Sequence, residues 1–151
     1  MKVKTLRVQQ FRNHDDVSYV FSPSTTLIHG PNGAGKTSLL EALYVAFRGS
    51  SFKGVDKDIV NERRDWYRID IEDDLYKRTV LFDNRSGKKL KQFVVDGKKT
   101  ARLSKKDKRP IILFSPDDLR LITGSPSRRR QYLDRMISQY DESYAVAVRR
   151  Y

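Results

Sequence analysis

The chain has 151 residues and a formal net charge of +12, from 31 Lys and Arg against 19 Asp and Glu. It contains no cysteine and two histidines, which excludes a disulfide framework, a thiolate metal site and a histidine-based metal site. No apolar run approaches the roughly 18 residues of a membrane helix, and no signal peptide is evident, so we expect a cytoplasmic protein. The positive charge favours a polyanionic partner, most simply nucleic acid.

Three strands are predicted before residue 30. An imperfect alternation of apolar and polar side chains predicts a half-buried strand over about residues 2–11, followed by a turn at 11–14. Val17–Phe21 is the second predicted strand and ends at Ser22-Pro23-Ser24. Thr25–His29 is predicted as a short third strand that leads into a glycine-rich stretch.

That stretch, Gly30-Pro31-Asn32-Gly33-Ala34-Gly35-Lys36-Thr37, matches the phosphate-binding loop G-x-x-x-x-G-K-[ST]. Successive N–H groups in such a loop form an anion-binding nest, and the helix that follows directs its dipole at the phosphates. Apolar residues at helical spacing predict this helix over Lys36–Phe47, with its end near Gly49. We predict that Lys36 reaches the β- and γ-phosphates and that the Thr37 hydroxyl joins Mg²⁺. The predicted nucleotide-contacting residues of this segment are Gly30, Pro31, Asn32, Gly33, Ala34, Gly35, Lys36, Thr37 and Ser38.

Residues 66–109 are predicted to form an antiparallel meander. A loop at 50–54 and a short helical turn within 55–62 precede it. Turn signals at 84–87 and at Asp96-Gly97 separate the strand-like runs, and the second is typical of a two-residue hairpin loop. The three predicted strands are Trp66–Ile71, Leu75–Phe82 and Leu90–Val95.

The highest density of positive charge lies in this meander. Residues 85–109 contain eleven Lys and Arg against two acids, a local balance of +9. Hairpin tips with paired lysines can contact nucleic-acid phosphates, which adds salt-dependent affinity without sequence preference. The alternative is a solvated rim that prevents edge pairing with other chains. The residues predicted to contact DNA are Lys88, Lys89, Lys91, Lys98 and Lys99, with Lys53, Lys57, Arg63 and Arg64 as secondary candidates.

The last forty residues are predicted to be mostly helical. Pro110–Phe114 is fully apolar and is predicted as a buried strand. Ser115 as N-cap and Pro116 at the first helical position begin a short helix that ends at Gly124, and Ser125-Pro126 begins a long one. The apolar stripe of the long helix is Leu133, Ile137, Tyr140, Tyr144 and Val148. Arg128-Arg129-Arg130 oppose the dipole in its first turn, which favours an acidic partner or a phosphate; the alternative is an ordinary exposed run.

Three segments together resemble one family. They are Phe11-Arg12-Asn13, the phosphate loop with Leu40-Glu41-Ala42, and the run from Pro116 to Asp134. The chain resembles the RecF recombination mediators, bacterial DNA-repair ATPases of the ABC/SMC type, over its whole length. The resemblance implies an α/β P-loop NTPase head of the ABC-ATPase type. Residues 1–115 would form its N-terminal lobe, with a mixed or antiparallel sheet, and residues 116–151 the start of a helical lobe.

The resemblance also implies ligands and partners. The expected ligands are ATP and Mg²⁺, with Arg12 beside the phosphates. The expected partners are DNA at single-strand/double-strand junctions, RecR- and RecO-type mediators that help load recombinase at gaps, and a second copy in an ATP-dependent homodimer. No membrane partner is expected.

Three features of such a head are missing from the sequence. There is no Walker B run of four apolar residues ending in acids and no Ser-Gly-Gly/Gln signature loop, and no clear Gln follows Phe114. The acids at 70–74 and 117–118 lack a preceding apolar strand or lie at a helix start. We therefore interpret the chain as an N-terminal fragment that binds ATP and hydrolyses it negligibly. Two alternatives stay open: a non-enzymatic DNA-binding module, and a small P-loop kinase with Arg128–Arg130 as its lid.

Overall fold

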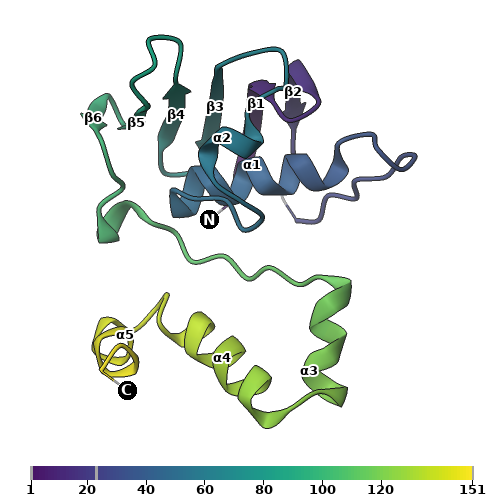
Figure 1. Ribbon diagram of the computed structural model, residues 1–151, viewed down its shortest axis with the longest axis vertical. Helices are drawn as coiled ribbons and strands as arrows, with labels where there is room; N and C mark the ends of the chain where they lie inside the picture. The colour runs from purple at the N-terminus through teal and green to yellow at the C-terminus, as the bar shows by residue number, and fades with distance from the viewer. Residues whose placement is uncertain (1, 23, 151) are drawn as a thin grey trace. The chain divides into compact units, whose positions relative to one another are not determined.

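A computed structural model describes residues 2–22 and 24–150, which fall into two compact units, one up to Lys108 and one from Arg109. The first unit is a six-stranded antiparallel sheet in the order β2-β1-β3-β4-β5-β6, with helix α1 (Lys36–Arg48) across one face (Figure 1). Its strands are β1 (Val3–Phe11), β2 (His14–Val20), β3 (Trp66–Asp73), β4 (Lys77–Asp83), β5 (Leu90–Val95) and β6 (Lys98–Thr100).

The core lies between α1 and the sheet. Alternate residues of β1 and β3, among them Leu6 and Ile69, are fully buried on this face, because side chains of a strand point to opposite sides in turn. The other face is polar: Arg68 and Asp70, adjacent positions on that face of β3, form an ion pair at 2.7 Å. One covered face and one polar face are typical of an antiparallel sheet.

Several predicted elements are confirmed. Helix α1 begins after Gly35 and ends at Gly49, whose N–H donates to the Val45 carbonyl at 2.8 Å. The predicted strands of the meander are present, with ends shifted by up to two residues. Asp96 and Gly97 both have positive φ, 47° and 80°, and form the two-residue turn between β5 and β6.

Two predicted strands are wrong. Thr25–His29 and Pro110–Phe114 both lack strand structure, and each has apolar side chains that are exposed, with Leu27 82% and Phe114 64% exposed. A strand is stable only when its backbone groups pair with a neighbouring edge. No strand in the described ranges pairs with either segment. Both segments contain residues that favour strands, but this preference does not supply a partner strand.

The second unit is a series of short helices rather than one long one. The predicted long helix is divided into α4 (Pro126–Ile137) and α5 (Glu142–Val148). The break occurs because the Asp141 side chain accepts a hydrogen bond from the Tyr144 N–H at 3.1 Å and so caps a new helix. The predicted start at Pro116 is confirmed. The pieces before α4 are a 3₁₀ turn, η2 (Pro116–Leu119), and α3 (Arg120–Thr123).

Arg129, the second residue of the arginine run at the start of α4, has a local structural role. One Arg129 N–H group donates to the Gly124 carbonyl at 2.9 Å and to the Leu121 carbonyl at 3.2 Å. These carbonyls lie at the C-terminal end of α3, where a cation is favoured. Across residues 2–22 and 24–150, no helix combines the length and apolar character that a bilayer crossing requires.

Candidate nucleotide-binding site

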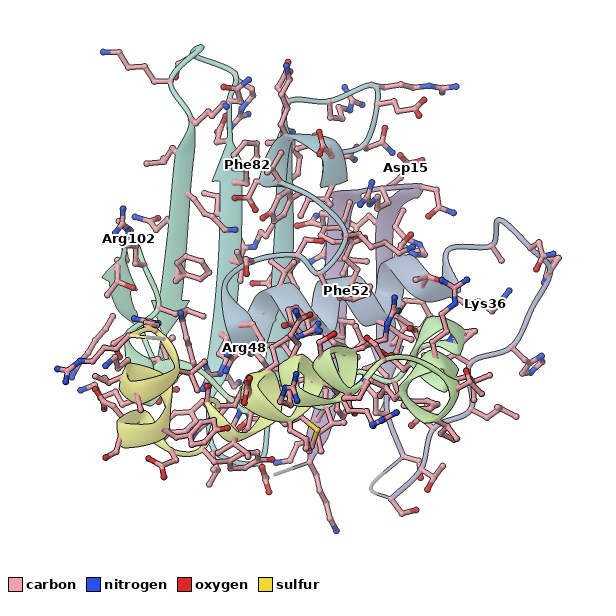
Figure 2. The ribbon with its side chains drawn as sticks, turned by 60° about the horizontal axis from the view of Figure 1, so that its bottom comes forward. Asp15, Lys36, Arg48, Phe52, Phe82 and Arg102 are labelled. Carbon is pink, nitrogen blue, oxygen red and sulfur yellow. The ribbon has the colours of Figure 1, made fainter. Side chains whose placement is uncertain are left out.

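A pocket of about 770 Å³ lies at the N-terminal end of α1. Its first wall is the glycine-rich loop with the first turn of α1, from Asn32 to Ser38. The second wall is the segment 58–63, and the turn between β1 and β2, with Arg12 and Asn13, completes the lining. In Figure 2, Lys36 stands at the start of α1 and Asp15 near the start of β2, and both line the pocket.

The β1–β2 turn holds the glycine-rich loop in place. The Asn13 side-chain amide donates to the Gly33 carbonyl at 2.9 Å, and a ring nitrogen of His14 lies 3.2 Å from the Gly35 carbonyl. The His14 side chain is buried against the loop. A motif at the end of β1 therefore supports a loop some twenty residues further along the chain.

The loop presents donors to the pocket. The first intrahelical bond of α1 joins the Leu39 N–H to the Gly35 carbonyl at 2.9 Å. The N–H groups of the first turn that come before Leu39 therefore have no acceptor within the helix. The Lys36 ammonium donates to the Gly30 carbonyl at 2.8 Å and to the Pro31 carbonyl at 2.7 Å. An ammonium has three donors, so one remains for an anion in the loop.

Arg12 lies at the edge of the pocket in an unusual conformation. Its φ of 52° is uncommon for a residue with a side chain. Its guanidinium donates to both carboxylate oxygens of Glu41, at 3.0 and 2.9 Å, and to the Asp58 carbonyl at 2.6 Å. The hydrogen bonds to Glu41 raise the pKa of Arg12. The structure thus places Arg12 beside the loop.

The second wall was not recognised in the sequence. Helix α2 (Asp56–Ile59) and the residues after it are joined to the end of β1 by two backbone bonds, Arg12 N–H to Ile59 O at 2.8 Å and Asn61 N–H to Gln10 O at 2.9 Å. This segment brings Arg63, predicted as a secondary DNA contact, into the pocket lining. No motif marks it, because only tertiary pairing with β1 brings it opposite the loop.

The side-chain charges of the lining balance. Three cations face three carboxylates, so the formal charge of the lining is zero. The attraction for an anion must therefore come mainly from the loop amides and the dipole of α1. The charged residues are Arg12, Lys36 and Arg63 against Asp15, Asp58 and Glu62.

Asp70 and Asp73, two of the acids that the sequence offers as metal ligands, do not line this pocket. The Asp70 carboxylate accepts from Arg68 at 2.7 and 2.9 Å and from the Thr79 hydroxyl at 2.6 Å on the open face of the sheet. Asp73 is buried beside Arg78, and neither acid lines the pocket. Asp118 accepts the Ser115 N–H at 2.7 Å, a bond that lowers its pKa.

Residues 5–147 match the family described as the AAA domain. The chain belongs to the AAA domain family. Over its whole length it is 36% identical to the DNA replication and repair protein RecF of Desulforamulus reducens, and 35% identical to that of Ligilactobacillus salivarius. It spans 41% and 40% of the length of these two relatives. The predicted resemblance to RecF is confirmed.

Solved structures agree with this assignment. The chain is similar to a recombination mediator protein RecF-ATP of the RecFOR pathway, with a TM-score of 0.73 and 28% identity, over 97% of this chain and 40% of the other. A RecF-ATPrS structure gives a TM-score of 0.74 at 30% identity, with the same coverage. An SMC ATPase, at 17% identity and a TM-score of 0.68 over 89% of this chain and 98% of its own, shares the fold. The predicted fold class, an ABC-type P-loop NTPase, is confirmed.

In this AAA domain the predicted DNA-contacting lysines are divided between two ends of the sheet. Lys88 and Lys89 lie in the β4–β5 turn, at the end where the β1–β2 turn also lies, because Asp83 pairs with Leu90. Lys98 and Lys99 lie at the other end of β5, because Val95 pairs with Lys98. A six-residue strand separates the two pairs by about 20 Å.

The second pair belongs to a larger group, which we call the β6 cluster. All its members have exposed side chains on β6 or in the segment that follows. Figure 2 shows Arg102 at the edge of the sheet away from Lys36. The β6 cluster consists of Lys98, Lys99, Arg102, Lys105, Lys106 and Lys108.

Lys91, which was predicted as a DNA contact, lies in a partly buried ion pair and not on an open basic surface. Its ammonium forms an ion pair with Asp56 and donates to the Gly49 carbonyl at 2.9 Å, and its side chain is only 17% exposed. Asp56 also accepts the Tyr67 hydroxyl at 2.7 Å, and burial raises the pKa of Tyr67. Lys91 therefore fixes α2 to the sheet.

Replacing Lys91 with methionine is expected to lower the free energy of unfolding by about 2–4 kcal/mol, because it leaves Asp56 without its cation in a partly buried site. Urea unfolding followed by circular dichroism measures this loss. Lys89→Met, at an exposed position, is the matched control and should change stability by less than about 0.5 kcal/mol. The folded Lys91 variant should keep its DNA affinity. A loss of DNA affinity without a loss of stability would instead show that Lys91 contacts DNA.

Proposed function

We propose that this chain is the ATP- and DNA-binding part of a RecF-like protein that acts in recombination and repair. The observation that supports this most strongly is the pocket at the start of α1, where loop amides, Lys36 and Arg12 surround a space of about 770 Å³. The similarity to the RecF-ATP structure, which extends over 97% of this chain, makes ATP the natural ligand.

In this proposal each part of the pocket has a separate role. The loop amides hold the phosphates, and Lys36 bonds the β- and γ-phosphates through its remaining donor. The Thr37 hydroxyl, in the first turn of α1, lines the pocket and fits a Mg²⁺ ligand position. Mg²⁺ would neutralise phosphate charge beside the carboxylates of the lining. Gly30, Pro31 and Ala34 complete the loop.

We propose negligible hydrolysis by this chain alone. Hydrolysis requires an acid that holds the metal and an oriented water, and here the sequence has no apolar run ending in acids. The ATP-dependent homodimer, which would bring a second copy to the nucleotide, and the RecR- and RecO-type mediators belong to the same proposal. The SMC ATPase described in terms of ATP-driven dimerization supports the first of these.

For DNA we propose the β6 cluster as the main contact surface. Its six cations lie on a three-residue edge strand and the short segment after it, with Asp107 as the one acid between Lys98 and Lys108. The Asp107 carboxylate accepts the Ser104 hydroxyl. Such a density of exposed cations suits backbone phosphates and carries no base specificity. Lys88 and Lys89, with Lys53, Lys57 and Arg64, would be peripheral contacts.

Separate and combined titrations of ATP and a labelled duplex, at two salt concentrations, test the function. We expect saturable ATP binding and DNA binding that weakens steeply with salt. Salt-dependent DNA binding without any ATP binding would instead favour the non-enzymatic DNA module. Phosphate transfer to a small alcohol, unaffected by DNA, would favour the kinase.

Neutralising Lys98 and Lys99 together should reduce the dependence of log K on log salt by nearly two, because each phosphate contact contributes about 0.9. Fluorescence anisotropy with a duplex across a salt series measures this slope. The matched control is the double variant Lys88→Ala/Lys89→Ala at the opposite end of β5, for which we expect a smaller change. The reverse order of effects would move the DNA surface to the β4–β5 turn.

A further inference from the structure

The guanidinium of Arg12 is held by three hydrogen bonds within the protein itself. Two of its N–H groups donate to Glu41 and one to the Asp58 carbonyl, while the side chain remains 28% exposed at the pocket. A guanidinium has five N–H donors, so two remain for a ligand. The residue also keeps a φ of 52°, a conformation that persists only where surrounding contacts enforce it.

Glu41 is the residue that provides most of this restraint. It lies on α1 five residues after Lys36, and its side chain is 1% exposed. A buried carboxylate is retained only when it is paired and hydrogen-bonded. Glu41 meets both conditions, since Arg12 binds both of its oxygens and the Ser51 hydroxyl donates to one of them.

Ser51 is fixed in its turn by the loop that follows α1. Its hydroxyl oxygen accepts the N–H of Lys53 at 2.8 Å and the N–H of Gly54 at 3.3 Å. With both of these acceptor contacts made, the hydroxyl hydrogen is directed at Glu41. The chain of contacts from Ser51 through Glu41 to Arg12 thus connects the pocket to α1, the same helix that carries Lys36.

We propose that Glu41, held by Ser51, is a positioning residue that fixes the Arg12 guanidinium toward the phosphates of a bound nucleotide. The proposal rests on the proposed binding of ATP in this pocket. A long, flexible side chain loses conformational freedom when it binds a ligand, and this loss weakens binding. Glu41 imposes the loss during folding, so that Arg12 already has its two remaining donors in place.

A double-mutant cycle in ATP binding tests the proposal. We expect Glu41→Gln to weaken ATP binding about tenfold when Arg12 is present, because the amide cannot bind the guanidinium through two acceptors. In the Arg12→Ala background the same change should have an effect of less than about twofold, since nothing is left to position. Isothermal titration calorimetry gives the four dissociation constants.

The chain offers a matched control in the Arg7–Asp16 pair. Asp16 accepts from Arg7 at 2.9 and 2.7 Å, a similar two-oxygen geometry, but it lies outside the pocket lining and both side chains are about half exposed. These hydrogen bonds lower the pKa of Asp16. Asp16→Asn should leave ATP affinity unchanged within about twofold.

A second variant covers the case in which Glu41→Gln does not fold. Ser51→Ala keeps the Arg12–Glu41 pair and removes one neutral hydrogen bond, so we expect ATP binding about threefold weaker with Arg12 present and unchanged in its absence. Equal losses in both Arg12 backgrounds, or no loss in either, would overturn the positioning role. Failure of the proposed function is distinguishable, because the unmodified chain itself would then not bind ATP.

Discussion

Lys36→Ala is expected to lower the affinity for ATP by about ten- to hundredfold. Hydrogen bonds to the carbonyls of Gly30 and Pro31 hold the Lys36 ammonium at the loop. The alanine variant removes the charge-assisted contact of this ammonium with the phosphates. A hydrogen bond between charged groups contributes about 1.5–3 kcal/mol, and each 1.4 kcal/mol corresponds to a tenfold change. Equilibrium titration with ATP and Mg²⁺ measures the change.

Lys53→Ala is the control for this variant, because Lys53 is exposed in the loop after α1 and does not line the pocket. We expect its ATP affinity to match that of the unmodified chain. Since the Lys36 bonds to the loop are at an exposed site, unfolding of Lys36→Ala should occur within about 1 kcal/mol of the unmodified chain. ATP affinity within about threefold of the unmodified value would show that the loop does not bind the triphosphate.

Gly35→Ala is expected to lower the free energy of unfolding by about 2–4 kcal/mol and to abolish ATP binding. Gly35 has a φ of 87°, and a Cβ there would lie 2.5 Å from the His14 ring and 2.8 Å from the Asn13 side-chain oxygen. The His14 ring is buried, so it cannot move aside without losing its packing. Urea unfolding and ATP titration on the same preparation measure both effects.

Gly33→Ala separates the steric part of this prediction from the conformational part. Gly33 has nearly the same φ, 83°, but a Cβ there would have no neighbour within 4 Å. This variant should therefore lose only the conformational contribution of about 1–2 kcal/mol. If the clash with His14 is the cause, adding His14→Ala to Gly35→Ala should destabilise less than the sum of the two single changes. Equal losses in the two glycine variants would contradict the steric argument.

Features that depend on neighbouring residues were predictable. The phosphate-binding loop is a contiguous motif whose glycines and lysine specify its chemistry, and α1 follows it with apolar residues at helical spacing and a glycine just beyond its end. The strands of the meander were predictable from alternation and from the turn at Asp96-Gly97. The loop residues could therefore be named as site candidates from the motif itself, whereas Arg12 was named from the resemblance to RecF.

The second wall of the pocket could not be predicted, because it depends on backbone pairing across about fifty residues of chain. Segment 58–63 has no motif of its own, and it faces the loop only because its backbone bonds to the end of β1. The role of Glu41 could not be predicted either. The sequence placed Glu41 in the helix after the loop, but its bond to Arg12 forms only when β1 and α1 pack together. Such contacts are set by register and packing, which a linear sequence does not display.

The sequence showed where lysines cluster and which residues favour strands or buried positions, since these preferences belong to the side chains themselves. Folding then assigned each of them a neighbour or none. Leu27 and Phe114 remain exposed in segments with which no described strand pairs. Lys91 pairs with Asp56, whereas Lys98 and Lys99 are exposed on the edge strand, because the hairpin register of β5 places them in different surroundings.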